Sequence, residues 1–207
     1  MIESPRTMPE PARDDALPQH NLRGAPRFTP MIQAAKMITD GGEFLCIVRD
    51  ASTDGMKIKH LGKLPEQDSF AVELANGERL SVCVVWSDDE HAGLRFFEGV
   101  DPPRLSGMPA NGMPRRQIRL SVNAIASVAW EMNQCRVDVV NLSQRGTCIR
   151  CASHLAIQQL VRFKLANFPE QYATVRWRKD DEYGLVFENT LSLEQLGQAV
   201  AAVNRKA

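Results

Sequence analysis

Apolar residues along this chain gather in short runs of four to eleven positions, separated by turn-forming residues. In the first half the runs are Met31–Ile38, Phe44–Val48, Met56–His60, Ser69–Leu74, Arg79–Trp86 and Gly93–Phe97. In the second half they are Leu120–Trp130, Cys135–Val140, Thr147–Cys151, Leu160–Leu165, Ala173–Arg178 and Gly184–Phe187. The intervening Asp40-Gly-Gly and Asn76-Gly favour tight hairpins. Six closely spaced strands in each half predict an all-β protein made of two small antiparallel barrels.

Only the C-terminus shows a different period. Ser192-Leu-Glu-Gln195 has the spacing of a capping box, and Leu193, Leu196, Val200 and Val203 follow at helical intervals. We therefore expect an amphipathic C-terminal helix, packed on the second barrel.

The two halves also repeat polar residues in register. Asp50-x-Ser52-x-x-Gly55 has a counterpart 91 positions later in Asn141-x-Ser143-x-x-Gly146. Arg23-x-x-x-Arg27 likewise corresponds to Arg115-x-x-x-Arg119, and Trp86 with Gly93-x-x-Phe96 to Trp177 with Gly184-x-x-Phe187. A register kept from Arg23 to Phe96 and from Arg115 to Phe187 indicates a duplicated domain.

The repeat sets the expected organisation of the chain. Residues 1–22 contain four prolines and little apolar periodicity, which predicts a disordered lead-in. The first barrel is assigned to residues 23–99, a Pro/Gly-rich linker to 100–114, and the second barrel with its helix to 115–207.

Charge and cysteine content narrow the functional classes. The net charge is zero, but residues 23–99 carry 9 basic and 12 acidic residues whereas residues 115–207 carry 13 and 8. The second copy is therefore the better host for an anion. No signal peptide or transmembrane segment is expected, and the five cysteines suggest no disulfide framework, so we expect reduced thiols in a cytoplasm.

The ordered set of motifs, Arg-x-x-x-Arg, Asp/Asn-x-Ser-x-x-Gly, Trp and Gly-x-x-Phe, resembles the PilZ domain, and it occurs twice. This family comprises six-stranded barrels that bind the bacterial second messenger cyclic di-GMP. The resemblance covers nearly everything outside the tail and linker, and it implies a non-enzymatic receptor with no cofactor. It also implies a ligand site in each copy: Arg23, Arg27, Asp50, Ser52 and Gly55 in the first, and Arg115, Arg119, Asn141, Ser143 and Gly146 in the second, where Arg116 adds a further charge.

The chemistry of these residue types fits such a ligand. Arginine binds phosphate and a guanine edge in a bidentate manner and stacks on purines. Asp50 or Asn141 can accept a guanine N–H, the serines can donate to phosphate or hold the turn, and each glycine permits a positive φ or a close backbone approach. The second copy ranks ahead, because Arg145 adds charge there whereas the first copy has Asp54 facing a dianion and Pro26 stiffening the approach to Arg27.

A mechanism follows from where Arg115 and Arg119 stand. They come directly after the linker, so we expect cyclic di-GMP to order residues near 110–120 and to change the angle between the barrels, or to cover a surface that a protein partner reads.

Several alternatives stand beside this interpretation. The Asp/Asn-x-Ser-x-x-Gly motif is also an ordinary turn, and Trp86, Trp177, Phe96 and Phe187 are expected in the cores. Cys148, Cys151 and His154 have the spacing of a partial zinc site, but no fourth ligand is apparent and the two thiols should face opposite sides of a strand. No catalytic constellation is evident, and the acidic first copy disfavours nucleic-acid binding. The main alternative is an adaptor that acts by protein–protein interaction in motility, pilus or exopolysaccharide control.

Overall fold

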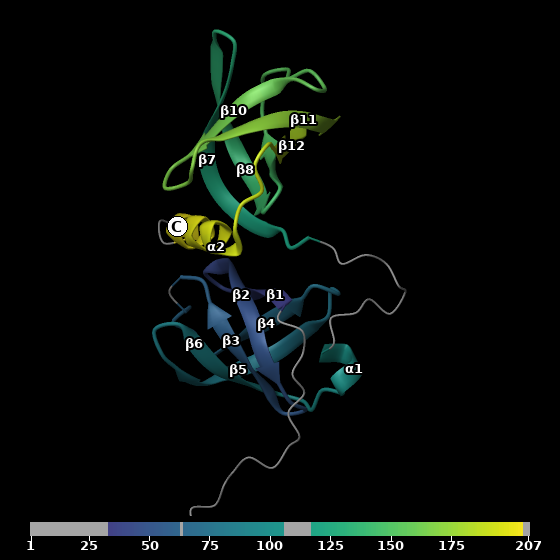
Figure 1. Ribbon diagram of the computed structural model, residues 1–207, viewed down its shortest axis with the longest axis vertical. Helices are drawn as coiled ribbons and strands as arrows, with labels where there is room; N and C mark the ends of the chain where they lie inside the picture. Colours follow the sequence, from purple (N-terminus) through teal and green to yellow (C-terminus); the bar gives the residue numbers. More distant parts are fainter. Residues whose placement is uncertain (1–32, 63, 106–116, 205–207) are drawn as a thin grey trace, which may run out of the picture.

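A computed structural model describes residues 33–62, 64–105 and 117–204, which form two closed six-stranded barrels and two helices (Figure 1). The first barrel contains β1 (Gln33–Thr39), β2 (Gly42–Ala51), β3 (Gly55–His60), β4 (Ser69–Leu74), β5 (Arg79–Ser87) and β6 (His91–Phe96). The second contains β7 (Leu120–Trp130), β8 (Asn133–Ser143), β9 (Gly146–Arg150), β10 (Leu160–Leu165), β11 (Gln171–Lys179) and β12 (Glu182–Phe187). The all-β prediction of two tandem six-stranded antiparallel barrels is confirmed.

Both barrels close in the same order. Around the first the strands run β1-β2-β3-β6-β5-β4, and around the second β7-β8-β9-β12-β11-β10, with antiparallel neighbours throughout. Inward side chains alternate with outward ones, as in the buried Phe70, Val72 and Leu74 of β4. The predicted Asp40-Gly41 and Asn76-Gly77 turns join β1 to β2 and β4 to β5.

The duplication extends to irregularities of the ladders. The β2–β3 register shifts between Val48 and Asp50, and the β8–β9 register shifts between Val139 and Asn141, 91 positions later. A second pair of shifts precedes Trp86 and Trp177. A β-bulge re-aims the side chains beside it. The repeated polar and tryptophan positions therefore lie where the strands depart from regular alternation.

The first residues of the expected linker at 100–114 belong to the first barrel in the structure. Val100 and Leu105 are buried in the core of the first barrel, and Leu105 ends the short helix α1 (Pro102–Leu105). The backbone N–H of Val100 donates to the Thr53 carbonyl, as that of Leu191 does to the Gln144 carbonyl in the second barrel. Residues 100–105 thus pack on the first barrel. The rest of the expected linker and the tail at 1–22 lie outside the described residues.

The predicted C-terminal helix is confirmed as α2 (Leu193–Asn204). Its capping box is complete, because the N–H of Gln195 donates to Ser192 Oγ at 3.0 Å and the Ser192 N–H donates to Gln195 Oε1 at 2.9 Å. A first-turn leucine, Leu196, is fully buried.

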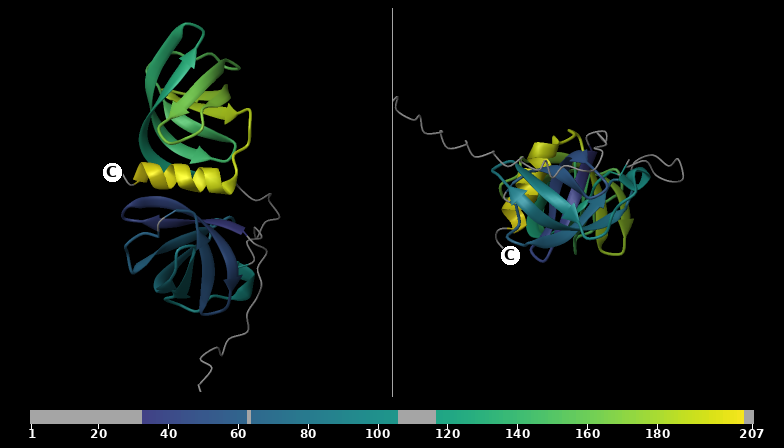
Figure 2. Two further views of the ribbon diagram at one scale, coloured as in Figure 1. Left: turned by 60° about the vertical axis from the view of Figure 1, so that its left-hand side comes forward. Right: turned by 90° about the horizontal axis from the view of Figure 1, so that it is seen from below.

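The helix packs on both barrels, whereas the sequence led us to expect only the second. Figures 1 and 2 show α2 lying between the barrels. Leu61 from the first barrel shares one apolar cluster with Leu120, Leu196 and Val200, and Gly197 lies so close to Leu61 that a β-carbon there would overlap it. Asn204 also donates to the Glu43 carbonyl at 2.9 Å. The helix therefore forms part of the interface between the two domains.

Candidate ligand-binding site

In the second barrel, the described residues of the predicted motif come together around one surface hollow. Arg119, Asn141, Ser143 and Gly146 line a cavity of about 310 Å³, and Arg145 and Trp177 line it as well. Asn141 and Ser143 come from the end of β8, Gly146 begins β9, and Arg119 directly precedes β7. The structure thus brings together those members of the predicted set that it describes. Arg115 and Arg116, like Arg23 and Arg27 of the first copy, lie outside the described residues.

The turn between β8 and β9 is held by its own side chains. Ser143 is 6% exposed, and its hydroxyl donates to the Gly146 carbonyl at 3.0 Å. The Thr147 hydroxyl donates to the Asn141 carbonyl at 2.8 Å across the bulge. These bonds engage the serine as a turn-forming group, and Arg119, Asn141 and Arg145 also line the hollow.

Gly146 is required by the barrel itself. Its φ is not in the left-handed region, but a β-carbon there would come closer than 3.0 Å to the Leu185 carbonyl oxygen of β12. Gly55 meets the Leu94 carbonyl of β6 in the same way. The sequence offered two reasons for glycine at these positions, a positive φ or a close backbone approach. The structure shows the close approach, and the approaching backbone belongs to the neighbouring strand.

The hollow carries a positive charge with one compensating acid. The guanidinium groups of Arg119 and Arg145 are exposed, and neither has a hydrogen bond or ion pair with another residue of the described chain. Glu182 also lines the wall, but its carboxylate is engaged by Arg150 at 2.8 Å. Burial raises the pKa of the Cys148 thiol on the same wall, so that side chain is neutral at physiological pH. Two free cations thus face this hollow.

Both tryptophans of the repeat lie at the surface, so their assignment to the cores is wrong. Trp86 is 45% and Trp177 44% exposed, whereas Phe96 and Phe187 are buried as expected. Each ring lies against the glycine paired with it across the ladder, Gly93 or Gly184, where a β-carbon would overlap the indole nitrogen. The repeated Trp and Gly therefore form a flat surface platform. Their fixed spacing was the signal for this pairing.

The corresponding region of the first barrel keeps the backbone and changes the side chains. Ser52 again donates to the Gly55 carbonyl, at 3.3 Å, and Asp50 is half-buried after the bulge. Asp54 replaces Arg145, and Lys57 replaces Cys148 and places its ammonium 5.7 Å from the centre of the Trp86 ring. A cation thus lies near the Trp86 ring, although Trp86 and Trp177 are about equally exposed.

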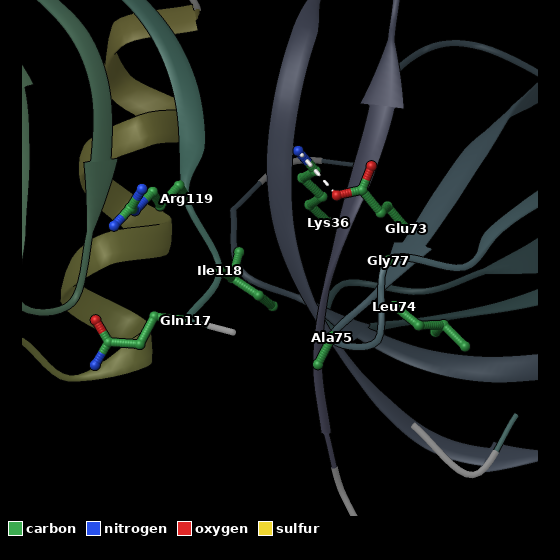
Figure 3. A pocket seen from close by; sticks show the side chains of 8 residues that line it. All are labelled: Lys36, Glu73, Leu74, Ala75, Gly77, Gln117, Ile118 and Arg119. Atoms are coloured by element: carbon green, nitrogen blue, oxygen red, sulfur yellow. Dashed lines mark ion pairs between the residues drawn. The ribbon is translucent and has the colours of Figure 1, made fainter. Parts of the chain in front are cut away.

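A second hollow, of about 580 Å³, separates the barrels and shares a wall with the first. Lys36, Glu73, Leu74, Ala75 and Gly77 line it from one barrel, and Gln117, Ile118 and Arg119 from the other. Figure 3 shows the side chains of Gln117 and Arg119 turned away from Lys36 while Ile118 points toward the first barrel. The segment 117–119 therefore contributes one face to the ligand hollow and the other to the domain interface.

Other predicted features concern metals and membranes. Within the described ranges, no cluster of three or more His, Cys, Asp or Glu side chains is arranged to hold a metal ion. Cys148 lines the ligand hollow whereas Cys151 belongs to the core, as their odd spacing predicted. None of the helices in the described part of the chain has the length and apolarity needed to cross a membrane.

No curated protein matches this chain. Among solved structures, the Borreliella burgdorferi PlzA protein in complex with c-di-GMP is similar at 13% identity, with 83% of this chain and 87% of that chain covered and a TM-score of 0.36. The Bacillus subtilis inhibitor of motility is similar at 13% identity, with 84% and 94% covered and a TM-score of 0.35. Escherichia coli YcgR in complex with c-di-GMP gives 12% identity, 84% and 85% coverage and a TM-score of 0.33. At these scores the similarities carry no further conclusion.

The family comparison is decisive because it covers most of the chain. The model of the PilZ domain matches twice, over residues 21–106 and 114–205. Each match takes in one of the two barrels, and the first ends one residue beyond α1. The chain therefore belongs to the PilZ domain family, with two copies of the domain in tandem.

Proposed function

We propose that this protein is a non-enzymatic receptor for cyclic di-GMP, with its principal site on the second barrel. The observation that carries the proposal is the hollow in which Arg119, Arg145, Asn141 and Trp177 converge. Phosphodiester groups require cations, guanine edges require a polar acceptor or donor, and a purine face stacks on an aromatic ring. All three kinds of group are present on one wall.

The two barrels differ in what they offer such a ligand. In the second, Arg145 extends the cationic wall, whereas in the first Asp54 stands at the equivalent turn position and the Lys57 ammonium lies 5.7 Å from the centre of the Trp86 ring. A dianion meets a carboxylate at the first turn and a guanidinium at the second. We therefore rank the second site ahead of the first, at Asp50, Ser52 and Gly55, in affinity.

The ligand hollow and the domain interface share the segment 117–119, which suggests how binding is transmitted. A ligand that draws Arg119 toward the second barrel also moves Ile118, whose side chain packs on the interface cluster. The binding free energy then favours whichever arrangement of the barrels lets Arg119 reach the ligand. Because the messenger is made and sensed inside bacteria, the proposal places the protein in the cytoplasm.

Isothermal titration calorimetry of the full chain with cyclic di-GMP tests the proposal. We expect saturable binding to the wild type, and a loss of roughly 10- to 100-fold in affinity for Arg119→Ala, as for a charged group contacting phosphate. Arg162→Ala is the matched control, because Arg162 lies on β10 and is paired with Glu170. Absence of heat at roughly tens of micromolar protein, or an unchanged affinity in Arg119→Ala, contradicts the proposal.

The adaptor alternative draws on a neighbouring surface, whose edge at Val186 also lines the ligand hollow. Leu160, Tyr172 and Val186 are each more than 40% exposed and stand on the adjacent strands β10, β11 and β12. Exposed apolar side chains gathered on one face mark protein contacts. Under this alternative the protein binds a partner in the absence of any dinucleotide, and Arg119→Ala leaves that binding unchanged.

A further inference from the structure

Cys135 and Cys151 bring two free thiols together inside the second barrel. Their sulfur atoms are 3.4 Å apart although the residues are 16 positions apart in sequence. The sequence suggested no disulfide framework, and the partial zinc motif contained Cys151 but not Cys135. The proposed ligand site uses neither thiol.

The pair is created by the way β8 and β9 end. The last backbone pair of this ladder is Asp138 with Arg150, and beyond it the inward-facing Cys135 of β8 meets Cys151 diagonally. Cys151 is held from the other side, because its N–H donates to the Asp181 carbonyl at 2.9 Å. Cys135 is therefore positioned by β8, and Cys151, which directly follows β9, by its hydrogen bond to Asp181.

We propose that Cys135 and Cys151 form a reversible disulfide when the protein meets a peroxide. A disulfide bond is about 2.05 Å long, so the sulfur atoms need to approach by about 1.4 Å from their present separation. A rotation of the two side chains about their Cα–Cβ bonds changes sulfur positions on this scale while leaving the ladder in place.

The chemistry balances with hydrogen peroxide as the oxidant. The thiolate of the more accessible Cys135 attacks one peroxide oxygen, which gives a sulfenic acid and releases hydroxide. The Cys151 sulfur then attacks the Cys135 sulfur, the hydroxyl of the sulfenic acid leaves as water with the Cys151 proton, and the S–S bond forms. Two thiols and one peroxide thus give one disulfide and two water molecules, and a dithiol reductant reverses the reaction by exchange.

The short distance between their sulfur atoms selects this pair among the five cysteines, since half-burial is shared by Cys135 and Cys83. Cys135 is half-buried, which leaves its sulfur within reach of a small oxidant, whereas Cys46 is fully buried. Burial, reinforced by the adjacent Cys151, raises the pKa of Cys135 to about 11. Because only the thiolate attacks peroxide, the oxidation is slow at neutral pH and accelerates as the solution is made alkaline.

The cross-link would stabilise the part of the barrel that carries the polar motif. It closes a loop over residues 135–151, and this loop contains the whole turn from Asn141 to Gly146. Closing a loop of this length restricts the unfolded chain. We expect the midpoint of thermal unfolding to rise by roughly 5–10 °C on oxidation.

Peptide mass spectrometry of the peroxide-treated full chain tests the proposal directly. Tryptic cleavage at Arg136, Arg145 and Arg150 places Cys135 in peptide 120–136, Cys148 in 146–150 and Cys151 in 151–162. We expect peptides 120–136 and 151–162 to be joined, to weigh two hydrogen atoms less than their sum, and to separate after dithiothreitol treatment.

Two variants complete the experiment. Cys83→Ser, which removes the half-buried thiol of the first barrel, should keep both the cross-link and the rise in midpoint. Cys151→Ser should lose both, and its far-UV circular dichroism shows whether the barrel is folded. Free thiols at Cys135 and Cys151 after exhaustive peroxide treatment of the wild type, or a cross-link from either residue to Cys148, would overturn the proposal whatever the variants do.

Discussion

The carboxylate of Glu43 in the first barrel accepts a hydrogen bond of 2.7 Å from the backbone N–H of Ser121 in the second. Glu43 also binds the Lys36 ammonium at 3.1 Å, and its carbonyl accepts the bond from Asn204 of α2. Ser121 in turn is the ladder partner of Asn141. One side chain thus joins the first barrel to the strand that supports the proposed ligand site.

Replacing Glu43 with alanine should loosen the two barrels. The substitution removes the acceptor for Ser121 and one of the two acids that hold Lys36, and we expect a loss of about 1–2 kcal/mol in unfolding free energy. Small-angle scattering should show a larger radius of gyration. Glu90→Ala is the control, because Glu90 is 63% exposed and pairs only with Lys59 of its own barrel. Equal effects of the two substitutions would contradict a role for Glu43 in the interface.

Glu73 should make this region sensitive to acid. Partial burial raises its pKa, but hydrogen bonds and charge from Arg79 and Lys36 outweigh burial, so the pKa lies below the usual 4.5. Because the pKa is lowered in the folded state, the stabilisation is complete above pH 4.5 and is lost as the pH falls through the lowered value.

As the pH is lowered below 4.5, the unfolding free energy should fall less in Glu73→Gln than in the wild type. Urea unfolding at a series of pH values measures it. Glu188→Gln, at an exposed carboxylate of the other barrel, should keep the wild-type dependence of unfolding free energy on pH. A wild-type slope in Glu73→Gln would show that other carboxylates govern the acid response.

Gly146→Ala should destabilise the second barrel by about 2–3 kcal/mol, since the new methyl group overlaps the backbone of β12 and neither strand can yield without breaking the ladder. Thermal unfolding measures the loss. Gly41→Ala is the matched control, because its β-carbon meets only the Thr39 hydroxyl, at 3.7 Å. If Gly146→Ala unfolds like the wild type but no longer binds the ligand, then Gly146 serves the ligand and not the fold.

Much of the fold could be predicted from the sequence because its signals are local. Strands Ser69–Leu74, Leu120–Trp130 and Leu160–Leu165 were predicted with the bounds that the structure gives, since alternation and turn residues mark their ends. The capping box at Ser192 likewise fixed the start of α2. The contact of α2 with the first barrel could not be predicted in this way. A small residue such as Gly197 permits close packing but does not indicate which surface packs against it.

The sequence indicated which residues of the second turn lie together, but it placed the tryptophan in the core. Spacing placed Asn141, Ser143 and Gly146 together, since a bulge and a two-residue turn fix them locally. Trp177 was assigned to the core because large aromatic residues are usually buried, whereas a bulge turns it onto the surface over Gly184. The pairing of Cys135 with Cys151 depends on where two strands end, which composition does not reveal.

Trp177→Ala should weaken binding of cyclic di-GMP by roughly 5- to 100-fold, the cost of losing one base-stacking platform. Calorimetry measures the affinity, and quenching of indole fluorescence by the ligand should disappear in the variant. Trp86→Ala is the matched control, because Trp86 is equally exposed but belongs to the first barrel, where Asp54 replaces Arg145. Equal losses in the two variants would mean that the first barrel stacks the ligand as well.

Exchanging the turn residues of the two barrels should transfer affinity between them. Arg145→Asp places a carboxylate in the cationic hollow, and we expect a loss of roughly tenfold or more, whereas Asp54→Arg should strengthen the first site by a similar factor. Both positions are exposed and both turns use the same backbone bond, from Phe96 to Asp54 and from Phe187 to Arg145, so folding should be unaffected.

Calorimetric titration resolves the two sites when their affinities differ, and the double variant should bind with the order of the sites reversed. If Asp54→Arg leaves the first site silent, Lys57 over Trp86 is the feature that closes it, and Asp54→Arg combined with Lys57→Cys should then open it.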